Sequence, residues 1–496
     1  MSGSASLFAS LALSLALIGC AETKRSPALG SSEPRPERPA TPTPAPTTAV
    51  SVNAAAKANP GSVAPTRLVL SGGAERVAAN DVTAAEVEAV VRANNAFAVA
   101  LFAQLRSSSK GQNLLSSPLS ASLALTMTYA GAKAETAREI AAALQLGEGS
   151  SKAIFEGQNA LSQALLRRGP AALAEAQTSP WRHETPAPND FQLQVVNSIW
   201  GQADYPWETP FLRTLSENYG TGVTAVDFRD QLEPAREAIN AWVSTETGDK
   251  IKDLLPRGTL DTSTRMVLVN ALHLKLPWAK PFSASDTDSA VFTRGDGKKS
   301  STRFMHLQGK FDYRDDGAAQ IISLPLSGQQ LTVLIALPHA GTSLASYQRT
   351  LRAGSVALKT PKDDALVALS LPKASFTSET FSLALALKAL GVKRAFDGVK
   401  ADFSGMCSHI PDGFNLYLSD VWQKTMIAIQ ETGVEAAAAT AVGVAVAASA
   451  PAHRLPPPVP IPMIVNRPYL ISVVDQPTGA ILLLGQINDP SDGGSP

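Results

Sequence analysis

One stretch near the C-terminus constrains this chain more than any other, residues 431–450, which read ETGVEAAAATAVGVAVAASA. From Val434 onward every β-branched residue falls on an even position, while Glu435 and small residues fill the odd positions. Strict alternation with branched residues on one face is typical of a β-strand. The small residues on the other face predict a strand that fits between two neighbouring strands.

Two other structures are compatible with this composition. Alanine is the best helix former, so a helix is the main alternative for residues 436–450 taken alone. A membrane span is disfavoured because Glu435 interrupts a segment that is shorter than the ~20 apolar residues a span needs. The prolines of residues 456–462 cannot donate hydrogen bonds to a sheet and predict a stiff, exposed tether. A strand next to such a tether has two states available, outside a sheet and within it.

The start of this stretch is similar to the reactive-centre loop hinge of the serpins, the serine protease inhibitor family. The family pattern is a glycine, a small residue, a glutamate and a run of alanines. The hinge positions in this chain are Glu431, Gly433, Val434, Glu435, Ala436, Ala437, Ala438, Ala439 and Thr440. The resemblance implies a loop that is exposed until a protease cleaves it and that then enters a sheet.

Five further segments resemble the same family in the same order, so the resemblance covers about Ala84 to Pro490. These segments are residues 113–144, 235–255, 266–282, 401–405 and 466–490. The resemblance implies an α+β fold, the serpin fold, with large mixed and antiparallel β-sheets, about eight or nine helices and an exposed reactive-centre loop.

Periodicity predicts several elements without reference to a family. Helices are expected at residues 84–105, 235–247 and 381–390, with another from Pro118 to Gly131, and strands at 191–200, 331–338 and 367–371. Two apolar strands joined by a turn at Gln476 to Gly479 are expected within residues 466–490. Residues 169–190, rich in proline and alanine, are interpreted as a surface insertion.

The resemblance also implies a network of polar residues that controls opening of the main sheet. Its members here are Ser117, Ser120, Asn270, Gln423, Lys424 and Trp278. Asn270 is a polar residue within an apolar run, so it needs a hydrogen-bond partner or costs roughly 1 to 3 kcal/mol. Where the family usually has a histidine before the lysine, this chain has Gln423. Glutamine donates and accepts hydrogen bonds but does not titrate, so pH-sensitive opening through this position is not expected.

The N-terminal region is predicted to be separate from the folded domain. Residues 26–65 consist mostly of Pro, Ala, Thr and Ser, with few large apolar residues to bury. We predict a disordered linker over 20–66 and one serpin domain over 84–490. Lysine plus arginine equals aspartate plus glutamate at 43 each, so no net charge favours binding to nucleic acid or an anionic membrane.

Residues 1–19 are predicted to be a signal peptide. The run LFASLALSLALIGC ends at Cys20 and resembles the lipobox of bacterial lipoproteins, in which that cysteine is lipidated. An ordinary signal peptide is the alternative, since residues 1–10 lack the Lys or Arg expected of an n-region. The lipobox implies a protein of the cell envelope, an outer-membrane lipoprotein in a Gram-negative cell or otherwise extracellular, that contacts the membrane only through its lipid.

Other chemistries lack their motifs. The sequence has no GxSxG elbow and no phosphate-binding glycine loop, and we predict neither enzyme activity nor a cofactor. Its six histidines (183, 273, 306, 339, 409 and 453) lack metal-ligand spacing, so no metal site is expected. Cys407 is interpreted as a lone thiol without a redox role.

Two functions remain open. One is a suicide inhibitor of serine proteases, and the other is a non-inhibitory protein of the same fold that serves in binding or structure. Non-inhibitory relatives tend to carry bulky, charged or proline residues in the hinge, whereas residues 436–439 are all alanine. The hinge therefore favours an inhibitor, expected to be a monomer, whose partner is a serine protease.

The scissile bond is predicted by counting forward from Gly433 with the usual family spacing, which gives Ala447–Ala448. A small apolar residue before the bond indicates an elastase-like or subtilisin-like protease. Counting back from Asn466 gives a bond nearer Pro457, and the rival bond there is Arg454–Leu455, which suits a trypsin-like enzyme. The forward count is preferred because the alternating valines stop at Val446.

Overall fold

The structure is a computed structural model that describes residues 68–109, 111–147, 149–178, 190–378, 380–409, 415–434 and 458–491. The predicted signal peptide, Cys20 and the whole predicted linker over 20–66 lie outside the described residues. So do the later hinge positions and both candidate scissile bonds: Glu435, Ala436, Ala437, Ala438, Ala439, Thr440, Ala447, Ala448, Arg454 and Leu455. The description below concerns one compact unit, which begins at Val63.

The first of two large sheets, called here the main sheet, carries the hinge. Its strands run in the order β1 (Leu68–Leu70), β4 (Val223–Val226), β3 (Gln192–Gln202), β5 (Met266–Pro277), β14 (Gly433–Val434), β13 (Asp420–Ile429) and β11 (Ala374–Thr377), with β12 (Phe381–Ser382) also paired to β13. β3 and β5 are antiparallel, whereas β13 pairs in parallel with β5. β5 is buried along nearly its whole length, as a central strand requires.

The second sheet is antiparallel except at one edge. Its order is β15 (Ile461–Ile464), β10 (Asp364–Pro372), β7 (Lys299–Asp315), β8 (Ala319–Pro325), β9 (Leu331–Pro338), β16 (Tyr469–Asp475), β17 (Ile481–Ile487) and β2 (Leu114–Ser116), with β6 (Asp288–Thr293) on β7. β15 pairs in parallel with β10. β16 and β17 form the hairpin expected from the sequence, and Gly479 in its turn has a φ of 75°, a conformation that favours glycine.

Nine α-helices lie within the described residues, in agreement with the predicted fold. They are α1 (Ala84–Ser108), α2 (Pro118–Tyr129), α3 (Ala134–Ala143), α4 (Ser151–Leu166), α5 (Arg168–Thr178), α6 (Thr209–Tyr219), α7 (Leu232–Glu246), α8 (Leu344–Arg349) and α9 (Ala384–Ala389). The 3₁₀ turns are η1 (Ala79–Asp81), η3 (Ala284–Asp286), η4 (Val356–Leu358) and η5 (Arg394–Phe396). None of these helices is long and apolar enough to cross a membrane.

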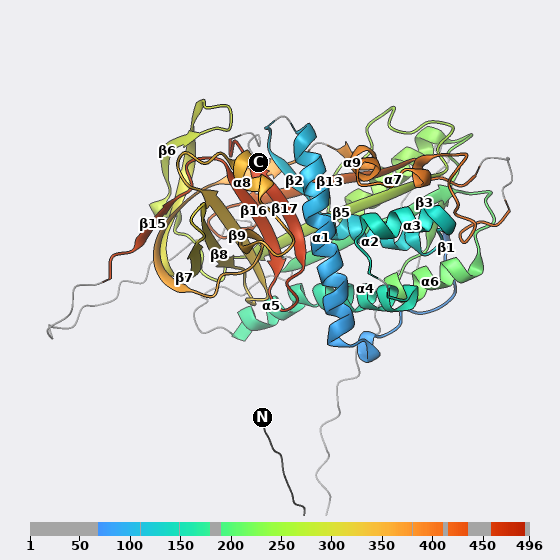
Figure 1. Cartoon of the computed structure of the whole chain (residues 1–496), viewed down its shortest axis with the longest axis horizontal. Coiled ribbons are helices and arrows are strands. Elements are labelled where there is room, and N and C mark those ends of the chain that lie inside the picture. The colour runs from blue at the N-terminus through green and yellow to red at the C-terminus, as the bar shows by residue number, and fades with distance from the viewer. Residues whose placement is uncertain are drawn as a thin grey trace, which may run out of the picture. The chain divides into compact units, whose positions relative to one another are not determined.

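Two helices place the main sheet against the rest of the core. α1 starts at a capping box formed by Thr83 and Glu86, and it packs between α2 and β17 (Figure 1). α2 has Ser117 as its N-cap and Pro118 at its first position, and its side chains are buried around the whole helix. α2 packs on both β3 and β5, and its N-cap Ser117 hydrogen-bonds to Gln423 of β13.

The first half of the surface insertion predicted at residues 169–190 is helical. α5 covers Arg168–Thr178 and buries Ala172 and Ala176. Arg168 fixes its start through an ion pair of 2.7 Å from Nε to Oδ1 of Asp475, whose carboxylate is fully buried. Alanine is the best helix former, and its small side chain permits close packing. An alanine-rich composition is therefore compatible with a helix here.

Candidate functional site

The hinge already begins to form a strand of the main sheet. Val434 pairs with Leu276 of β5 on one side and with Ile429 of β13 on the other, so β14 lies between the two strands at one end. Val434 is almost fully buried. A Cβ on Gly433 would lie 2.5 Å from the Leu276 carbonyl oxygen and from the Pro277 Cα, so only glycine fits there.

The turn that precedes β14 is held by the residues that follow β5. The backbone N–H of Trp278 donates to the Thr432 carbonyl at 3.0 Å, and that of Phe282 donates to the Glu431 carbonyl at 2.9 Å. The Trp278 indole Nε1 donates to the Gln430 carbonyl at 2.8 Å. Trp278 and Phe282 pack edge to face, with ring centroids 6.0 Å apart.

Glu431 fixes the same turn by its charge. Its carboxylate lies 2.8 Å from the Lys373 ammonium and accepts a hydrogen bond from the Thr287 hydroxyl at 3.1 Å. Partial burial opposes ionisation of Glu431, but the hydrogen bonds and charge of Lys373 and Thr287 outweigh it and lower the pKa of Glu431. The turn is therefore anchored to the Lys373 position, between β10 and β11.

Beyond the end of β14, β5 and β13 pair directly, and a buried polar cluster joins them to α2. Gln423 Nε2 donates to Asn270 Oδ1 at 2.6 Å and to the Ser117 carbonyl at 2.9 Å, while Gln423 Oε1 accepts from the Ser117 N–H at 3.0 Å. The Ser117 hydroxyl donates to Ser120 Oγ at 3.0 Å. All four residues are fully buried. The amide of Gln423 thus donates and accepts at once, which a neutral imidazole also does.

The polar cluster is not fully satisfied in this closed sheet. The Asn270 amide nitrogen is buried and has no hydrogen-bond partner in the described part of the chain. An unsatisfied buried donor costs about 1 to 3 kcal/mol. The closed arrangement of β5 and β13 is therefore less stable than its buried area alone indicates.

Two of the six residues assigned to the opening network lie outside this cluster. Lys424 follows Gln423 on β13 and points to the other face, where its ammonium donates to the Lys252 carbonyl at 2.9 Å and desolvation lowers its pKa. Trp278 lies beside the hinge turn, as described above. Successive residues of a strand face opposite sides, so Gln423 and Lys424 cannot both contact α2.

Three polar residues that were not singled out from the sequence extend the cluster. Thr425 donates from its hydroxyl to the Leu115 carbonyl at 2.8 Å, and its N–H donates to Ser378 Oγ at 2.9 Å. Asn197 of β3 lies opposite Asn270. When the Asn197 side-chain amide is oriented so that its nitrogen faces hydrogen-bond acceptors, this nitrogen donates to the Ser120 carbonyl at 3.0 Å. Of the three, only Thr425 had a signal in the sequence, since the period of two along the strand places it on the same face as Gln423.

Cys407 is buried, and its thiol donates to the His409 carbonyl at 2.8 Å. Burial raises the pKa of this thiol, which disfavours the reactive thiolate. Within the described ranges, no group of three or more His, Cys, Asp or Glu residues is placed to hold a metal ion.

Comparison with known proteins gives one consistent family. The family described as "Serpin (serine protease inhibitor)" matches residues 92–490. A serpin-like protein of Thermococcus kodakarensis is 33% identical over 406 residues, which cover 82% of this chain and 86% of the relative. The leukocyte elastase inhibitor of Bos taurus is 30% identical over 413 residues, covering 82% and 100% of the two chains.

Solved structures agree with the sequence comparison. The native state of tengpin, a thermophilic serpin, superposes with a TM-score of 0.70 at 25% identity, covering 85% of this chain and 99% of tengpin. The order of strands around β14 and the match over 92–490 lead to the same assignment. This chain belongs to the serpin family.

Proposed function

We propose that this protein inhibits a serine protease by acting as a suicide substrate and inserting its cleaved loop into the main sheet. The observation that carries the proposal is the position of β14 between β5 and β13. A strand that continues from Val434 in the same direction would separate β5 from β13 and pair with both. The named activity of a relative, the bovine leukocyte elastase inhibitor, supports the same function.

The mechanism has three steps. A protease binds the loop as a substrate, and its nucleophile attacks the scissile carbonyl to form an acyl-enzyme. Cleavage frees the upstream half of the loop, which enters between β5 and β13. Roughly a dozen new ladder hydrogen bonds at about 1 kcal/mol net each, together with burial of the valines, favour insertion. The attached protease moves with the loop, and distortion of its active site before hydrolysis traps the complex.

Insertion has a local cost that the structure identifies. The direct pairing of Gln423 with Asn270 must break, because the new strand passes between them. The unsatisfied Asn270 amide lowers that cost, since the closed sheet leaves one of its donors without a partner. The polar cluster thus holds the sheet closed without making the closed state the most stable one.

We further propose that the scissile bond is Ala447–Ala448 and that the target is an elastase-like or subtilisin-like protease. The test is incubation with an elastase-like and a trypsin-like protease, followed by denaturing gels and mass spectrometry of the new N-terminus. A covalent complex with the first enzyme and a fragment that starts at Ala448 is expected. A complex whose fragment starts at Leu455 would overturn the assignment of the scissile bond but not the proposal that the protein is an inhibitor.

An Ala438→Arg variant is the control for the mechanism. Arginine within the inserting segment obstructs a strand between β5 and β13 but leaves the docking residues unchanged. The variant should be cleaved at the same bond without forming the complex. Cleavage of the wild-type chain without any complex would contradict inhibition and favour the non-inhibitory alternative.

We also propose that Cys20 carries a lipid that anchors the protein to a membrane of the cell envelope. The support is the lipobox-like run that ends at this cysteine. A Cys20→Ser variant should leave the membrane fraction or fail to mature. Equal solubility of variant and wild type would contradict the anchor.

A further inference from the structure

One face of the second sheet exposes apolar side chains next to the point where the loop ends. The registers across β15, β10 and β7 align two rows of side chains, Pro462, Ala368 and Gln308 in one and Ile464, Ser370 and His306 in the other. Side chains that lie directly opposite one another share a face of a sheet. The two rows therefore belong to one face, called here the outer face.

The inner face of the same strands is part of the core. Met463, Val367 and Leu369 alternate with the outer residues, and each is at most 1% exposed. A sheet with one face in the core usually presents polar side chains to water on the other face. The outer face follows this rule on β7, which contributes Gln308 and His306. It does not follow it on β15 and β10.

The outer side chains of β15 and β10 are mostly apolar. Ile464 is 50% exposed, and just before β15 begins Val459 is 88% exposed. We call the apolar patch the set Val459, Ile461, Pro462, Ile464, Leu366 and Ala368, all of them partly or largely exposed. Scattered exposed apolar residues need no explanation, but a contiguous group of them marks an interaction site.

A chain of hydrogen bonds fixes the polar part of the outer face. His306 Nε2 lies 3.0 Å from Asp288 Oδ1 of β6, and His306 Nδ1 lies 2.9 Å from the Ser370 hydroxyl of β10. These contacts join three neighbouring strands. An apolar area beside a polar rim is the usual arrangement of a protein–protein interface. Because the sheet already holds this arrangement, little conformational entropy is lost on binding.

The position of the apolar patch in the chain identifies its partner. The segment between Val434 and Val459 contains both candidate scissile bonds. Val459 lies about eleven residues after Ala448, which is a span of at most about 40 Å when extended. A globular protease of about 200 residues has a diameter of about 40 Å. A protease bound at the loop is therefore wide enough to reach the patch.

We propose that the apolar patch is a second contact surface for the target protease, in addition to the loop. This inference rests on the proposed function. The patch contacts the side of the protease that receives the residues after the scissile bond. It contains no charged side chain, so it favours a protease whose surface there is apolar, because burying an unpaired charge against it is costly.

The test measures docking without cleavage. The full chain is immobilised for surface plasmon resonance, and the probe is an elastase whose nucleophilic serine is replaced by alanine. This probe cannot form an acyl-enzyme, so the Kd reports docking alone. Ile464→Ser should raise the Kd by about tenfold, because it removes an apolar side chain from the contact. Ile464→Leu should keep the Kd within about twofold of wild type.

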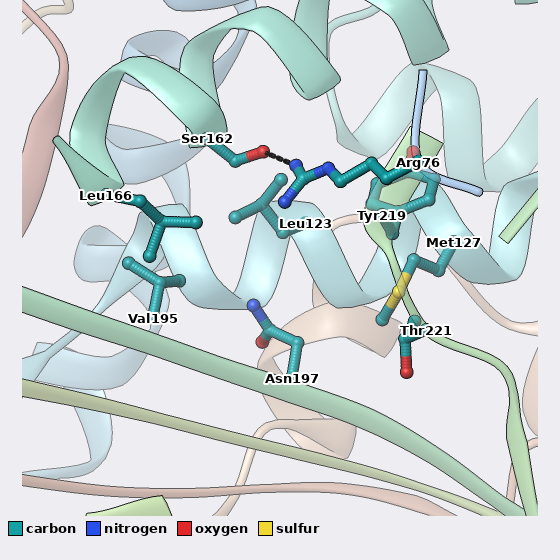
Figure 2. Close-up of a pocket in the computed structure, with 9 residues that line it drawn as sticks. All are labelled: Arg76, Leu123, Met127, Ser162, Leu166, Val195, Asn197, Tyr219 and Thr221. Atoms are coloured by element: carbon teal, nitrogen blue, oxygen red, sulfur yellow. Dashed lines mark hydrogen bonds between the residues drawn. The ribbon is translucent and has the colours of Figure 1, made fainter. Parts of the chain in front are cut away.

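Leu166→Ser is the matched control. Leu166 is 44% exposed, close to the value for Ile464, but it belongs to α4 and lies beside Val195 (Figure 2). Figure 1 shows α4 well apart from β15. The Kd of this variant should equal that of wild type. An unchanged Kd in Ile464→Ser would overturn the proposal, and if that variant failed to fold, Pro462→Ser at an exposed position of β15 would decide in the same way.

Failure of this proposal and failure of the inhibitory function give different results. Cleavage of wild type without a covalent complex would contradict inhibition, and the docking measurement would still decide about the patch. A covalent complex that forms equally fast in wild type and Ile464→Ser would overturn the patch alone. Self-association of wild type in sedimentation equilibrium, abolished in Ile464→Ser while protease docking is unchanged, would assign the patch to a second copy and overturn the proposal.

Discussion

At the scale of single residues, Gln423 decides how firmly β5 and β13 are joined. In a Gln423→Ala variant, the Ser117 N–H, the Ser117 carbonyl and Asn270 Oδ1 would lose their partner in a fully buried site. We expect the free energy of unfolding to fall by about 3 kcal/mol or more, because each buried orphan costs about 1 to 3 kcal/mol. Urea unfolding followed by fluorescence measures this loss.

The neighbouring residue provides the control for Gln423. Lys424→Ala removes a partly exposed side chain from the opposite face of β13, and its effect should stay below about 1 kcal/mol. Similar losses in the two variants would contradict a specific role of the cluster. None of Ser117, Ser120, Asn270 and Gln423 titrates near neutral pH, so the cluster itself should give no change in stability between pH 5.5 and 8.

The lowered pKa of Glu431 predicts that the stability of the hinge turn depends on pH. Its pKa is lowered in the folded protein, so its contribution to stability is present above the unfolded pKa of about 4.3 and is lost as the pH falls through the folded pKa. Glu431→Gln should be less stable than wild type by about 1 kcal/mol at pH 7. This difference should shrink toward zero when unfolding is measured at successively lower pH, below about 4.

The exposed pair of Arg92 and Glu88 on α1 is the comparison for Glu431. Both of its side chains are more than 60% exposed, so Glu88→Gln should have a smaller effect at every pH. An effect of Glu431→Gln that is the same at pH 7 and at the acid end of the series would show that the charge of Glu431 does not hold the turn.

At the scale of elements, the two residues of β14 determine where insertion begins. Gly433→Ala would place a Cβ against the backbone of β5, which cannot move aside as a flexible side chain can. We expect β14 to leave its position between β5 and β13, with faster amide hydrogen exchange at Ile429 and Val434 and a lower thermal midpoint. A Cβ on Gly147 would meet nothing within 4 Å, so Gly147→Ala should change neither quantity.

Much of the element order could be predicted from periodicity. The expected helix at residues 84–105 is α1, Ala84–Ser108, and the expected strand at 331–338 is β9 with the same bounds. β1 was not predicted, because Leu68–Leu70 has three residues and its partner β4 lies more than 150 residues later. The helix expected at 381–390 is shorter, Ala384–Ala389, because Phe381 and Ser382 pair with β13 instead.

The polar cluster was predictable only in part, for a physical reason. Family resemblance pointed to Ser117, Ser120, Asn270 and Gln423, and the structure brings these four together. Nothing in the sequence indicates that the Thr425 hydroxyl hydrogen-bonds to the Leu115 carbonyl, 310 residues away in the chain. Such a contact depends on how the strands and α2 are placed in the fold. The period of two along β13 already implies that Lys424 and Gln423 face opposite sides of the sheet, so that only one of them can contact α2.

At the scale of the whole molecule, the described fold predicts a native state that is not the most stable one. In the main sheet β5 and β13 pair directly in parallel, next to a polar cluster in which the Asn270 amide nitrogen lacks a partner among the described residues. At one end of this pairing, β14 already separates the two strands. The residues that follow β14 are those whose alternating valines predict a strand. A longer strand in this gap would pair with both neighbours, so the sheet with the loop inserted should be the more stable form.

Loop cleavage tests this prediction directly. Limited proteolysis at the loop should raise the thermal midpoint by about 10 °C or more, because roughly ten net hydrogen bonds are gained in a domain of this size. Ala438→Pro should be cleaved equally well but should show a much smaller rise, since proline within the new strand removes a ladder donor. Circular dichroism melts of the intact and cleaved forms of both proteins supply the comparison. If cleaved wild type melted at the same temperature as the intact protein, β14 would be a fixed short strand between β5 and β13, and insertion would not occur.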